Sequence, residues 1–294
     1  MNLFEKIKEK KYNEIINFIE KNPDVNLNLQ DSFKNYFIEY VLDSNNLKLI
    51  DFILSKDIYI DIIDNNGTTI IYNLIKFNKM DIFKLVIEKN KSNIGINVVD
   101  KKDIKGRTSL HYCVIFNNKD AFKFILENQG DPLIKDKGGL NVFFYCIKYE
   151  RNDFLFHLFN KFYSYKFLNN EGENLLQFAI SYSNQKVIDY LVNKTNINLN
   201  NQTFEIGLTC LHKLTINNDI ENIKFIIKKG ADVILSDYIG NNVIHYSLIG
   251  NSDELTLFYL DKNLIDLNLP NLEGNTPLHL YLQNINGKIN TKIL

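Results

Sequence analysis

Apolar side chains recur along the chain in short groups at helical spacing, and polar segments rich in Asn and Asp separate these groups. Near the start of the chain, two such groups predict two short helices between Leu3 and about Lys21, because apolar residues three or four apart share one helix face. Asn22-Pro23-Asp24 then ends the second helix, and Lys and Glu fill the outward positions. The apolar residues are Leu3, Phe4 and Ile7, then Ile15, Ile16, Phe18 and Ile19.

The same pattern returns throughout the chain and predicts helices in pairs. No apolar run approaches the roughly 20 residues that a membrane-spanning helix needs, so we expect no membrane insertion. The clearest predicted helices lie at about Tyr36–Leu42, Leu47–Leu54, Met80–Glu88, Phe122–Leu126, Val187–Leu191, Ile223–Ile227 and Pro277–Leu282.

A glycine marks the start of each predicted pair and reveals an internal repeat. The intervals between successive markers are 39, 33, 33, 35, 33 and 34 residues. One step of 33 before the first marker lies Lys34, which indicates a degenerate repeat without its glycine. Repeats of this length are typical of stacked helical solenoids. The marker glycines are Gly67, Gly106, Gly139, Gly172, Gly207, Gly240 and Gly274.

Residues at fixed distances from the marker form further columns. Two residues after it comes Thr or Asn, either of which can cap a helix by accepting a hydrogen bond from a free N–H of the first turn. Three residues before it comes Asp or Asn, which are turn formers; Phe204 is the one exception. The capping column is Thr69, Thr108, Asn141, Asn174, Thr209, Asn242 and Thr276, and the turn column is Asp31, Asp64, Asp103, Asp136, Asn169, Asp237 and Asn271.

Two segments, Gly106-Arg107-Thr108-Ser109-Leu110-His111 and Gly274-Asn275-Thr276-Pro277-Leu278-His279, resemble the Gly-x-Thr-Pro-Leu-His turn of an ankyrin repeat. The resemblance covers essentially the whole chain and implies an all-α ankyrin-repeat solenoid of helix-turn-helix units with short hairpin loops. We expect one domain over residues 1–294. Residues 1–30 form an N-terminal cap, residues 31–270 about seven repeats, and residues 271–294 a partial repeat. A fragment of a longer protein is favoured over a truncated cap, because four residues near the end are apolar: Ile285, Ile289, Ile293 and Leu294.

Net charge, cysteine usage and the first residues of the chain argue against several classes of function. The formal net charge of −1 and the scattered basic residues argue against a dedicated nucleic-acid or acidic-membrane surface. The three cysteines show no CxxC pair and lie at repeat positions, so Cys113, Cys146 and Cys210 are interpreted as small buried hydrophobes. The start of the chain lacks a signal-peptide core. We therefore expect a cytoplasmic or nuclear protein, and a monomer.

The histidines show no catalytic arrangement. His111, His212, His245 and His279 share one column, so they are structural positions; in the family, the resemblance implies, this histidine links the turns of neighbouring repeats. His157 instead takes an apolar position of a second helix, where a buried imidazole would need a partner. Phosphate-binding and nucleophile motifs are absent from the sequence. We expect no enzyme activity, no cofactor and no metal site.

The 39-residue interval contains six extra residues within the polar stretch Lys89–Asp103. Insertions in repeat proteins usually map to loops on one face. This one is either a partner contact or a tolerated surface loop, and the second reading is favoured.

One column distinguishes this sequence from a generic repeat. Five residues after the histidine column, at the end of the first helix, four consecutive repeats carry an aromatic residue: Phe77, Phe116, Tyr149 and Tyr182. In the family this column faces the concave groove, and aromatic residues often anchor protein interfaces. The alternative of equal weight is that the rings pack on adjacent helices and support the stacking of repeats. The candidate partner-binding residues are Phe77, Phe116, Tyr149 and Tyr182 with the preceding Lys76, Ile115 and Lys148.

The leading functional prediction is a non-catalytic module that binds a protein partner of unknown identity, as an adaptor or scaffold. Its concave face and hairpin tips would make the contacts, as the resemblance implies. The alternative is a targeting or regulatory segment of a larger enzyme, such as a kinase, an acyltransferase or a ubiquitin-ligase component, whose catalytic part lies outside this chain. A third, weaker alternative is an effector directed at host proteins.

Overall fold

The computed structural model describes residues 2–90, 98–162, 165–250, 252–261 and 265–284. The regular secondary structure of this part of the chain is helical apart from two single antiparallel bridges. The helices are α1 (Leu3–Lys8), α2 (Tyr12–Lys21), α3 (Phe37–Asp43), α4 (Leu47–Leu54), α5 (Ile71–Lys76), α6 (Met80–Asn90), α7 (Ser109–Phe116), α8 (Lys119–Glu127), α9 (Val142–Lys148), α10 (Asn152–Lys161), α11 (Leu175–Ser181), α12 (Gln185–Lys194), α13 (Cys210–Ile216), α14 (Ile220–Lys228), α15 (Val243–Ile249), α16 (Asp253–Asp261) and α17 (Pro277–Asn284). The predicted all-α class is confirmed.

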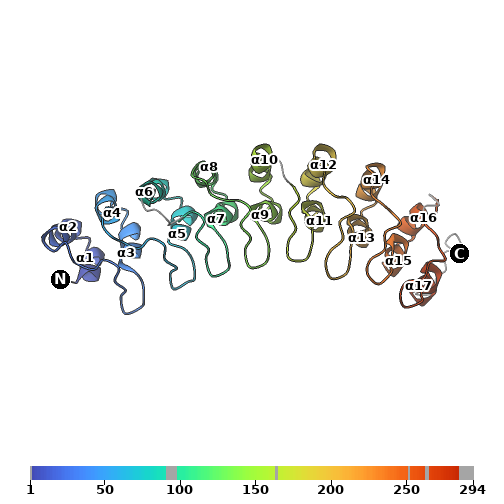
Figure 1. The fold of residues 1–294 in the computed structure, drawn as a ribbon, viewed down its shortest axis with the longest axis horizontal. Helices are drawn as coiled ribbons and strands as arrows, with labels where there is room; N and C mark the ends of the chain where they lie inside the picture. Colours follow the sequence, from blue (N-terminus) through green and yellow to red (C-terminus); the bar gives the residue numbers. More distant parts are fainter. Residues whose placement is uncertain (1, 91–97, 163–164, 251, 262–264, 285–294) are drawn as a thin grey trace. The chain divides into compact units, whose positions relative to one another are not determined.

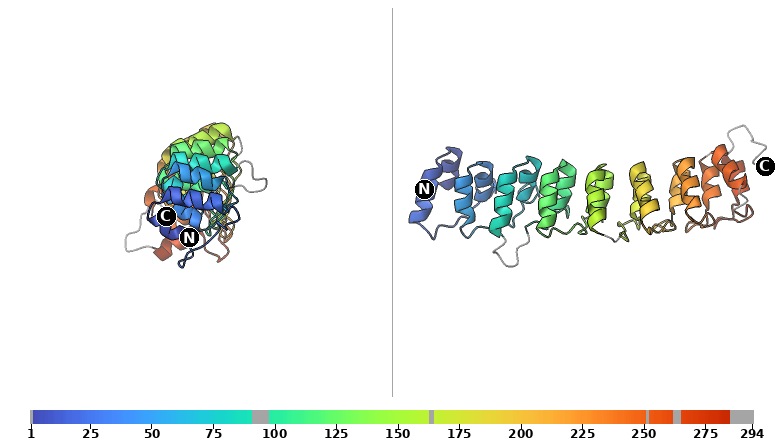
Figure 2. Two further views of the ribbon diagram at one scale, coloured as in Figure 1. Left: turned by 90° about the vertical axis from the view of Figure 1, so that its left-hand side faces the viewer. Right: turned by 90° about the horizontal axis from the view of Figure 1, so that it is seen from above.

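The chain forms two compact units, residues 1–145 and residues 146–294. In the first unit, α1 packs on α3 and α5 on α7, while α2, α4 and α6 form a second layer. In the second unit, α11, α13, α15 and α17 pack in a row, and α12, α14 and α16 each lie against the first helix of their own repeat. Within each unit the loops that join successive repeats project from the side of the first helices (Figure 1), and the helices stack as repeated pairs (Figure 2).

The two helices of a repeat are buried differently. The second helices are amphipathic: in α8, Ala121, Phe122, Ile125 and Leu126 are buried and the remaining positions are partly or fully exposed. The first helices lie between neighbours and are buried on most sides, so that in α7 every residue from Ser109 to Val114 is buried. Stacking of adjacent repeats therefore supplies the core, as expected for a quasi-one-dimensional fold.

The marker residue of each turn has a left-handed backbone. Gly106 has φ +80°, and a Cβ atom there would lie 2.8 Å from the backbone nitrogen of Lys137, so both conformation and space favour glycine. Lys34 adopts the same conformation, with φ +64°, in the repeat that lacks a glycine. The degenerate repeat therefore keeps the turn geometry of its neighbours, against the usual preference of an L residue.

Left-handed residues also end several of the first helices. Asn78, Asn117, Ser183 and Asn218 have φ between +51° and +57°. Glu150 takes this conformation in the repeat where the sequence offered no Asn or Ser, with φ +55°. Repeat geometry thus imposes the helix stop even on a residue that does not favour it.

Two sequence interpretations need correction. Phe204 does not occupy the turn position; Thr203, one residue earlier, does so, and its Oγ1 accepts a hydrogen bond from the Leu208 N–H (2.9 Å). The extra residues of the 35-residue interval shift this register by one. His157 is exposed rather than buried, because it lies on the outer face of α10, so it bears no burial cost.

Other predictions fall on parts that the structure does not describe. The centre of the Lys89–Asp103 insertion, residues 91–97, lies outside the described residues. The same holds for residues 285–294, on which the prediction of a fragment depended.

Candidate functional site

Two histidines of the column, His111 and His245, form buried turn clamps. The Thr108 N–H donates to His111 Nδ1 (3.0 Å), so the ring proton lies on Nε2, which donates to the Leu140 carbonyl of the next turn (3.2 Å). His245 makes the same pair of contacts, to the Asn242 N–H and to the Asn275 carbonyl, each at 3.3 Å. The predicted linkage of neighbouring turns by this histidine is confirmed in these two repeats.

Gln177 replaces the histidine in one repeat and reproduces its bonds. Its Oε1 accepts from the Asn174 N–H (3.0 Å), and its Nε2 donates to the Asn201 and Leu208 carbonyls (both 2.8 Å). The side chain is fully buried. This position therefore requires one acceptor and one donor about an imidazole's width apart, and it does not require acid–base chemistry.

Burial keeps these imidazoles neutral. It lowers the pKa of His111 to about 4, and the nearby Asp103 and Asp136 carboxylates only partly oppose this effect. Burial likewise lowers the pKa of His212 to about 4, and it lowers the pKa of His245. A base poised near neutral pH would have been expected of a catalytic histidine, so the column is structural.

A side chain of the turn column, an aspartate in most repeats, organises the turn beside the clamp. Asp103 Oδ1 accepts from the N–H groups of Lys105 (2.8 Å) and Arg107 (2.7 Å), and its Oδ2 pairs with the Arg107 guanidinium. In the equivalent place, Asp237 Oδ2 accepts from the Tyr246 hydroxyl (2.7 Å). The columns of turn formers read from the sequence thus have direct partners in the structure.

The thiols lie outside the clamps. Cys113, Cys146 and Cys210 are buried free thiols, and burial raises the pKa of each. Among the described residues, no group of three or more His, Cys, Asp or Glu side chains is placed to hold a metal ion. Within the same ranges, no helix is both long and apolar enough to cross a membrane.

The aromatic column divides in the first unit. Phe77, the C-cap of α5, is 61% exposed, and the Lys76 ammonium lies 5.2 Å from its ring centre. Phe116 ends α7 and is half-buried, with its ring edge-on to Tyr72 at 5.3 Å. Ile115 is half-buried beside it. Phe77 is therefore available to a partner, whereas Phe116 also contributes to packing between repeats.

The second unit shows the same division. Tyr182, the C-cap of α11, is 39% exposed, and its ring leans on Phe178, one turn earlier, at 4.7 Å. Tyr149 follows α9 directly and is half-buried, while the preceding Lys148 is exposed. The structure thus places all four rings at ends of first helices and leaves the binding and packing roles of the column as predictions.

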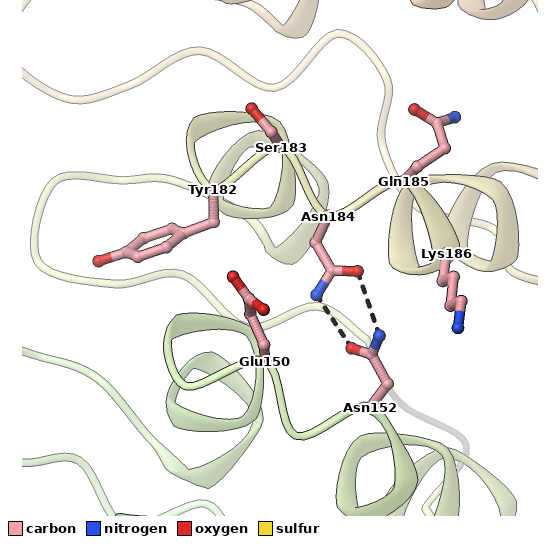
Figure 3. A pocket seen from close by; sticks show the side chains of 7 residues that line it. All are labelled: Glu150, Asn152, Tyr182, Ser183, Asn184, Gln185 and Lys186. Atoms are coloured by element: carbon pink, nitrogen blue, oxygen red, sulfur yellow. Dashed lines mark hydrogen bonds between the residues drawn. The ribbon is translucent and has the colours of Figure 1, made fainter.

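A polar depression of about 430 Å³ adjoins Tyr182 (Figure 3). Its floor carries a reciprocal pair of amides, in which Asn184 Nδ2 donates to Asn152 Oδ1 (2.9 Å) and Asn152 Nδ2 donates to Asn184 Oδ1 (3.4 Å). The Glu150 carboxylate lies beside this pair, and the Tyr182 ring extends away from it. The two amides link neighbouring repeats and satisfy each other. The depression therefore offers a ligand its exposed lining side chains, which are Glu150, Tyr182, Ser183, Gln185 and Lys186.

Known proteins with the same architecture confirm the repeat. The family model described as "Ankyrin repeats (3 copies)" matches residues 37–136 and 143–237, which is more than half of the chain. The crystal structure of the ankyrin repeat domain of Bcl-3, a member of the IκB protein family, superposes with a TM-score of 0.62 at 18% identity. The match covers 73% of this chain and 94% of that one, and at this identity it shows the fold alone.

Similar sequences occur in several kinds of organism. An ankyrin repeat protein of Acanthamoeba polyphaga mimivirus, L371, is 24% identical in an alignment 339 positions long, which covers 95% of this chain. An ankyrin repeat protein of Rickettsia felis is 26% identical over 155 residues, or 42% of this chain. Human Notch-regulated ankyrin repeat-containing protein is 29% identical over 94 residues, which are 31% of this chain and 82% of that protein. The matches span 40% of the length of the viral and of the rickettsial relative.

Proposed function

The chain belongs to the ankyrin-repeat family, and on this premise we propose that it is a protein-binding module without catalytic activity of its own, acting as an adaptor or scaffold. We place it in the cytoplasm or nucleus, as a monomer formed by one repeat domain over residues 1–294. A net charge of −1 supports a protein partner over a nucleic acid. Repeats of this family are a general protein-interaction architecture.

One observation carries the proposal: the recurring polar side chains of the turns are engaged in hydrogen bonds within the fold, whereas exposed rings remain at the ends of first helices. His111 and Gln177 use their polar atoms to join turns. Phe77 and Tyr182 remain exposed, with Lys76 over the face of one of them. Exposed aromatic rings next to lysines favour a partner segment with acidic and aromatic side chains.

Affinity capture with mass spectrometry tests this proposal. The wild type is compared with a variant in which Phe77, Phe116, Tyr149 and Tyr182 are all changed to Ser, and circular dichroism monitors the helical fold. We expect the folded variant to lose at least one specific partner. Capture of the same proteins by both would exclude the aromatic column as the binding site. A large loss of thermal stability would assign the column to packing.

A narrower variant separates the two roles. Phe77→Ser with Tyr182→Ser removes only the exposed rings and leaves the half-buried Phe116 and Tyr149 in place. We expect this pair to reproduce the loss of binding with little change in stability. Lys76→Ala and Lys148→Ala then measure the contribution of the adjacent charges, since both lysines are exposed.

A further inference from the structure

Three successive hairpins of the second unit carry exposed apolar residues at their tips. We call these residues the tip row; they do not belong to the aromatic column and the sequence columns did not reveal them. Leu272 is 79% exposed and Phe204 58%, although side chains of this kind are usually buried. The tip row is Phe204, Ile206, Tyr238, Ile239 and Leu272.

Backbone hydrogen bonds join the tips into one continuous surface. The Tyr238 N–H donates to the Ile206 carbonyl (2.8 Å), and the Leu272 N–H donates to the Ile239 carbonyl (2.9 Å). On the other side, the Phe204 N–H donates to the Glu171 carbonyl (2.8 Å). The loops of these repeats project side by side (Figure 1). The apolar side chains therefore line a bonded strip of backbone, and they are not scattered singly.

Close contact with the preceding turn holds two of these rings in place. A Cβ atom on Gly172 would lie 2.6 Å from the ring of Phe204, and one on Gly207 would lie 2.6 Å from the ring of Tyr238. One face of each ring thus covers a glycine while the rest of the side chain remains exposed. Rings held in this way lose little conformational entropy when a partner covers them.

The charge at the hairpin tips differs between the two units. In the first unit the charged tip residues are Lys34, Lys105 and Lys137. In the second unit they are Glu171, Glu205 and Glu273, all exposed, and no ion pair to them is found among the described residues. The tip row therefore lies in an acidic setting that would attract positive charge and repel nucleic acid or anionic lipid.

We propose that the tip row binds a protein segment in which apolar and basic side chains are interspersed. Its apolar residues cover Phe204, Tyr238 and Leu272, and its Lys or Arg residues pair with Glu171, Glu205 and Glu273. This inference rests on the proposed protein-binding function but assigns binding to a separate surface. The partner segment at the tip row is basic, whereas the one expected at the aromatic column is acidic. Apolar contact supplies affinity, and the glutamates supply specificity.

Synthetic peptides test the recognition chemistry directly with the full chain. The probe is a peptide of about twelve residues, long enough to lie along several tips when extended, with interspersed Leu, Lys and Ser. Two counter-probes replace every Lys by Glu or every Leu by Ser. By isothermal titration calorimetry we expect the Leu/Lys peptide to bind at least about tenfold more tightly than either counter-probe. Equal binding of the Leu/Glu peptide would overturn the proposal.

Variants locate the binding. Glu171→Lys, Glu205→Lys and Glu273→Lys together should reverse the preference toward the Leu/Glu peptide, and these exposed positions leave the fold intact. Phe204→Ser, Tyr238→Ser and Leu272→Ser together should weaken the Leu/Lys peptide by at least about tenfold. The matched control, Lys34→Glu with Lys105→Glu, alters tips of the first unit and should change neither result. Two results would refute the assignment: loss of Leu/Lys-peptide binding in the control, or an unchanged peptide preference in the triple glutamate variant.

Two further outcomes separate this inference from the proposed function. If partner capture is lost in the aromatic-column variant but unchanged in both tip variants, and the peptide does not bind, the tip row fails while the proposed function stands. If neither set of variants changes capture, both fail. Analytical ultracentrifugation tests whether a second copy of this chain occupies the tip row instead. Self-association that the triple glutamate variant abolishes would show that it does and would overturn the proposal.

Discussion

The buried turn clamps and the exposed aromatic column lie at opposite ends of the same first helices. At the start of α7, His111 is fully buried and its two ring nitrogens reach partners in two successive turns. At the end of α5, Phe77 is mostly exposed and contacts only the lysine beside it among the interactions found. Both positions recur at the repeat interval, yet only the side chain at the first position is used up in hydrogen bonds that hold the fold together.

Recurrence in a repeat sequence therefore does not by itself indicate function. Gln177 can occupy in its repeat the position that His111 occupies in another, because the clamp requires only an acceptor and a donor at the right separation. The aromatic column stops after Tyr182, since the equivalent later residues are not aromatic. The histidine column is interrupted as well, since Tyr72 and Phe144 occupy it in two repeats, so recurrence alone distinguishes neither role.

Removal of a buried clamp should give the largest effect. His111→Ala leaves the Thr108 N–H and the Leu140 carbonyl without their partner and opens a cavity, so we expect a loss of about 3 kcal/mol in unfolding free energy. Urea unfolding followed by circular dichroism measures this loss. The control is His279→Ala, because His279 is exposed in the structure and should be nearly neutral. Equal effects at both positions would contradict the clamp role.

Acid should weaken the clamps next. The pKa of His111 and of His212 is about 4 in the folded chain, below the usual value near 6.5 expected on unfolding. The unfolded chain thus binds more protons between these pH values, and stability falls as pH drops from about 6.5 to 4. The expected loss at pH 5 is on the order of 2 kcal/mol per histidine. Urea midpoints at pH 7.5 and 5 measure it.

The matched control for this acid effect comes from the chain itself. The double variant His111→Gln with His212→Gln copies the residue found naturally at Gln177. A glutamine side chain does not change its charge between these two pH values. We expect this variant to keep a flatter stability profile across the same range. A profile as steep as that of the wild type would show that the two histidines do not cause the acid effect.

Two aromatic substitutions compare packing with exposure. Phe116→Ser removes the edge-on contact with Tyr72 and should cost about 1–2 kcal/mol. Phe77→Ser should change stability much less, because its ring is mostly in solvent. Thermal melts of the two single variants, run in parallel, give the difference. A larger loss for Phe77 would mean that its ring supports the stack.

The smallest effect should be a gain in the degenerate repeat. Lys34 holds a left-handed backbone, φ +64°, that other repeats assign to glycine. Lys34→Gly relieves that strain but raises the entropy of the unfolded chain, so we expect stabilisation of at most about 0.5–1 kcal/mol. Differential scanning calorimetry detects it as a raised transition temperature. Destabilisation would show that the lysine side chain contributes more than its backbone costs.

The sequence by itself determined the repeat, the helix pairs and the polar columns of the turns. These features depend on local geometry: Asp103 bonds to residues two and four positions away, and Asn117 ends its own helix. Their partners lie nearby in sequence, so residue type and spacing are sufficient to predict them.

Only the tertiary structure decided which repeated side chains remain available. The separation of Phe77 from Phe116, the exposure of His157 and the alignment of the tip row depend on contacts between residues about 33 or more positions apart. The turn role of Thr203 required the structure as well, because an insertion had shifted the register. Exposure is a property of the stacked repeats together, and no single repeat encodes it.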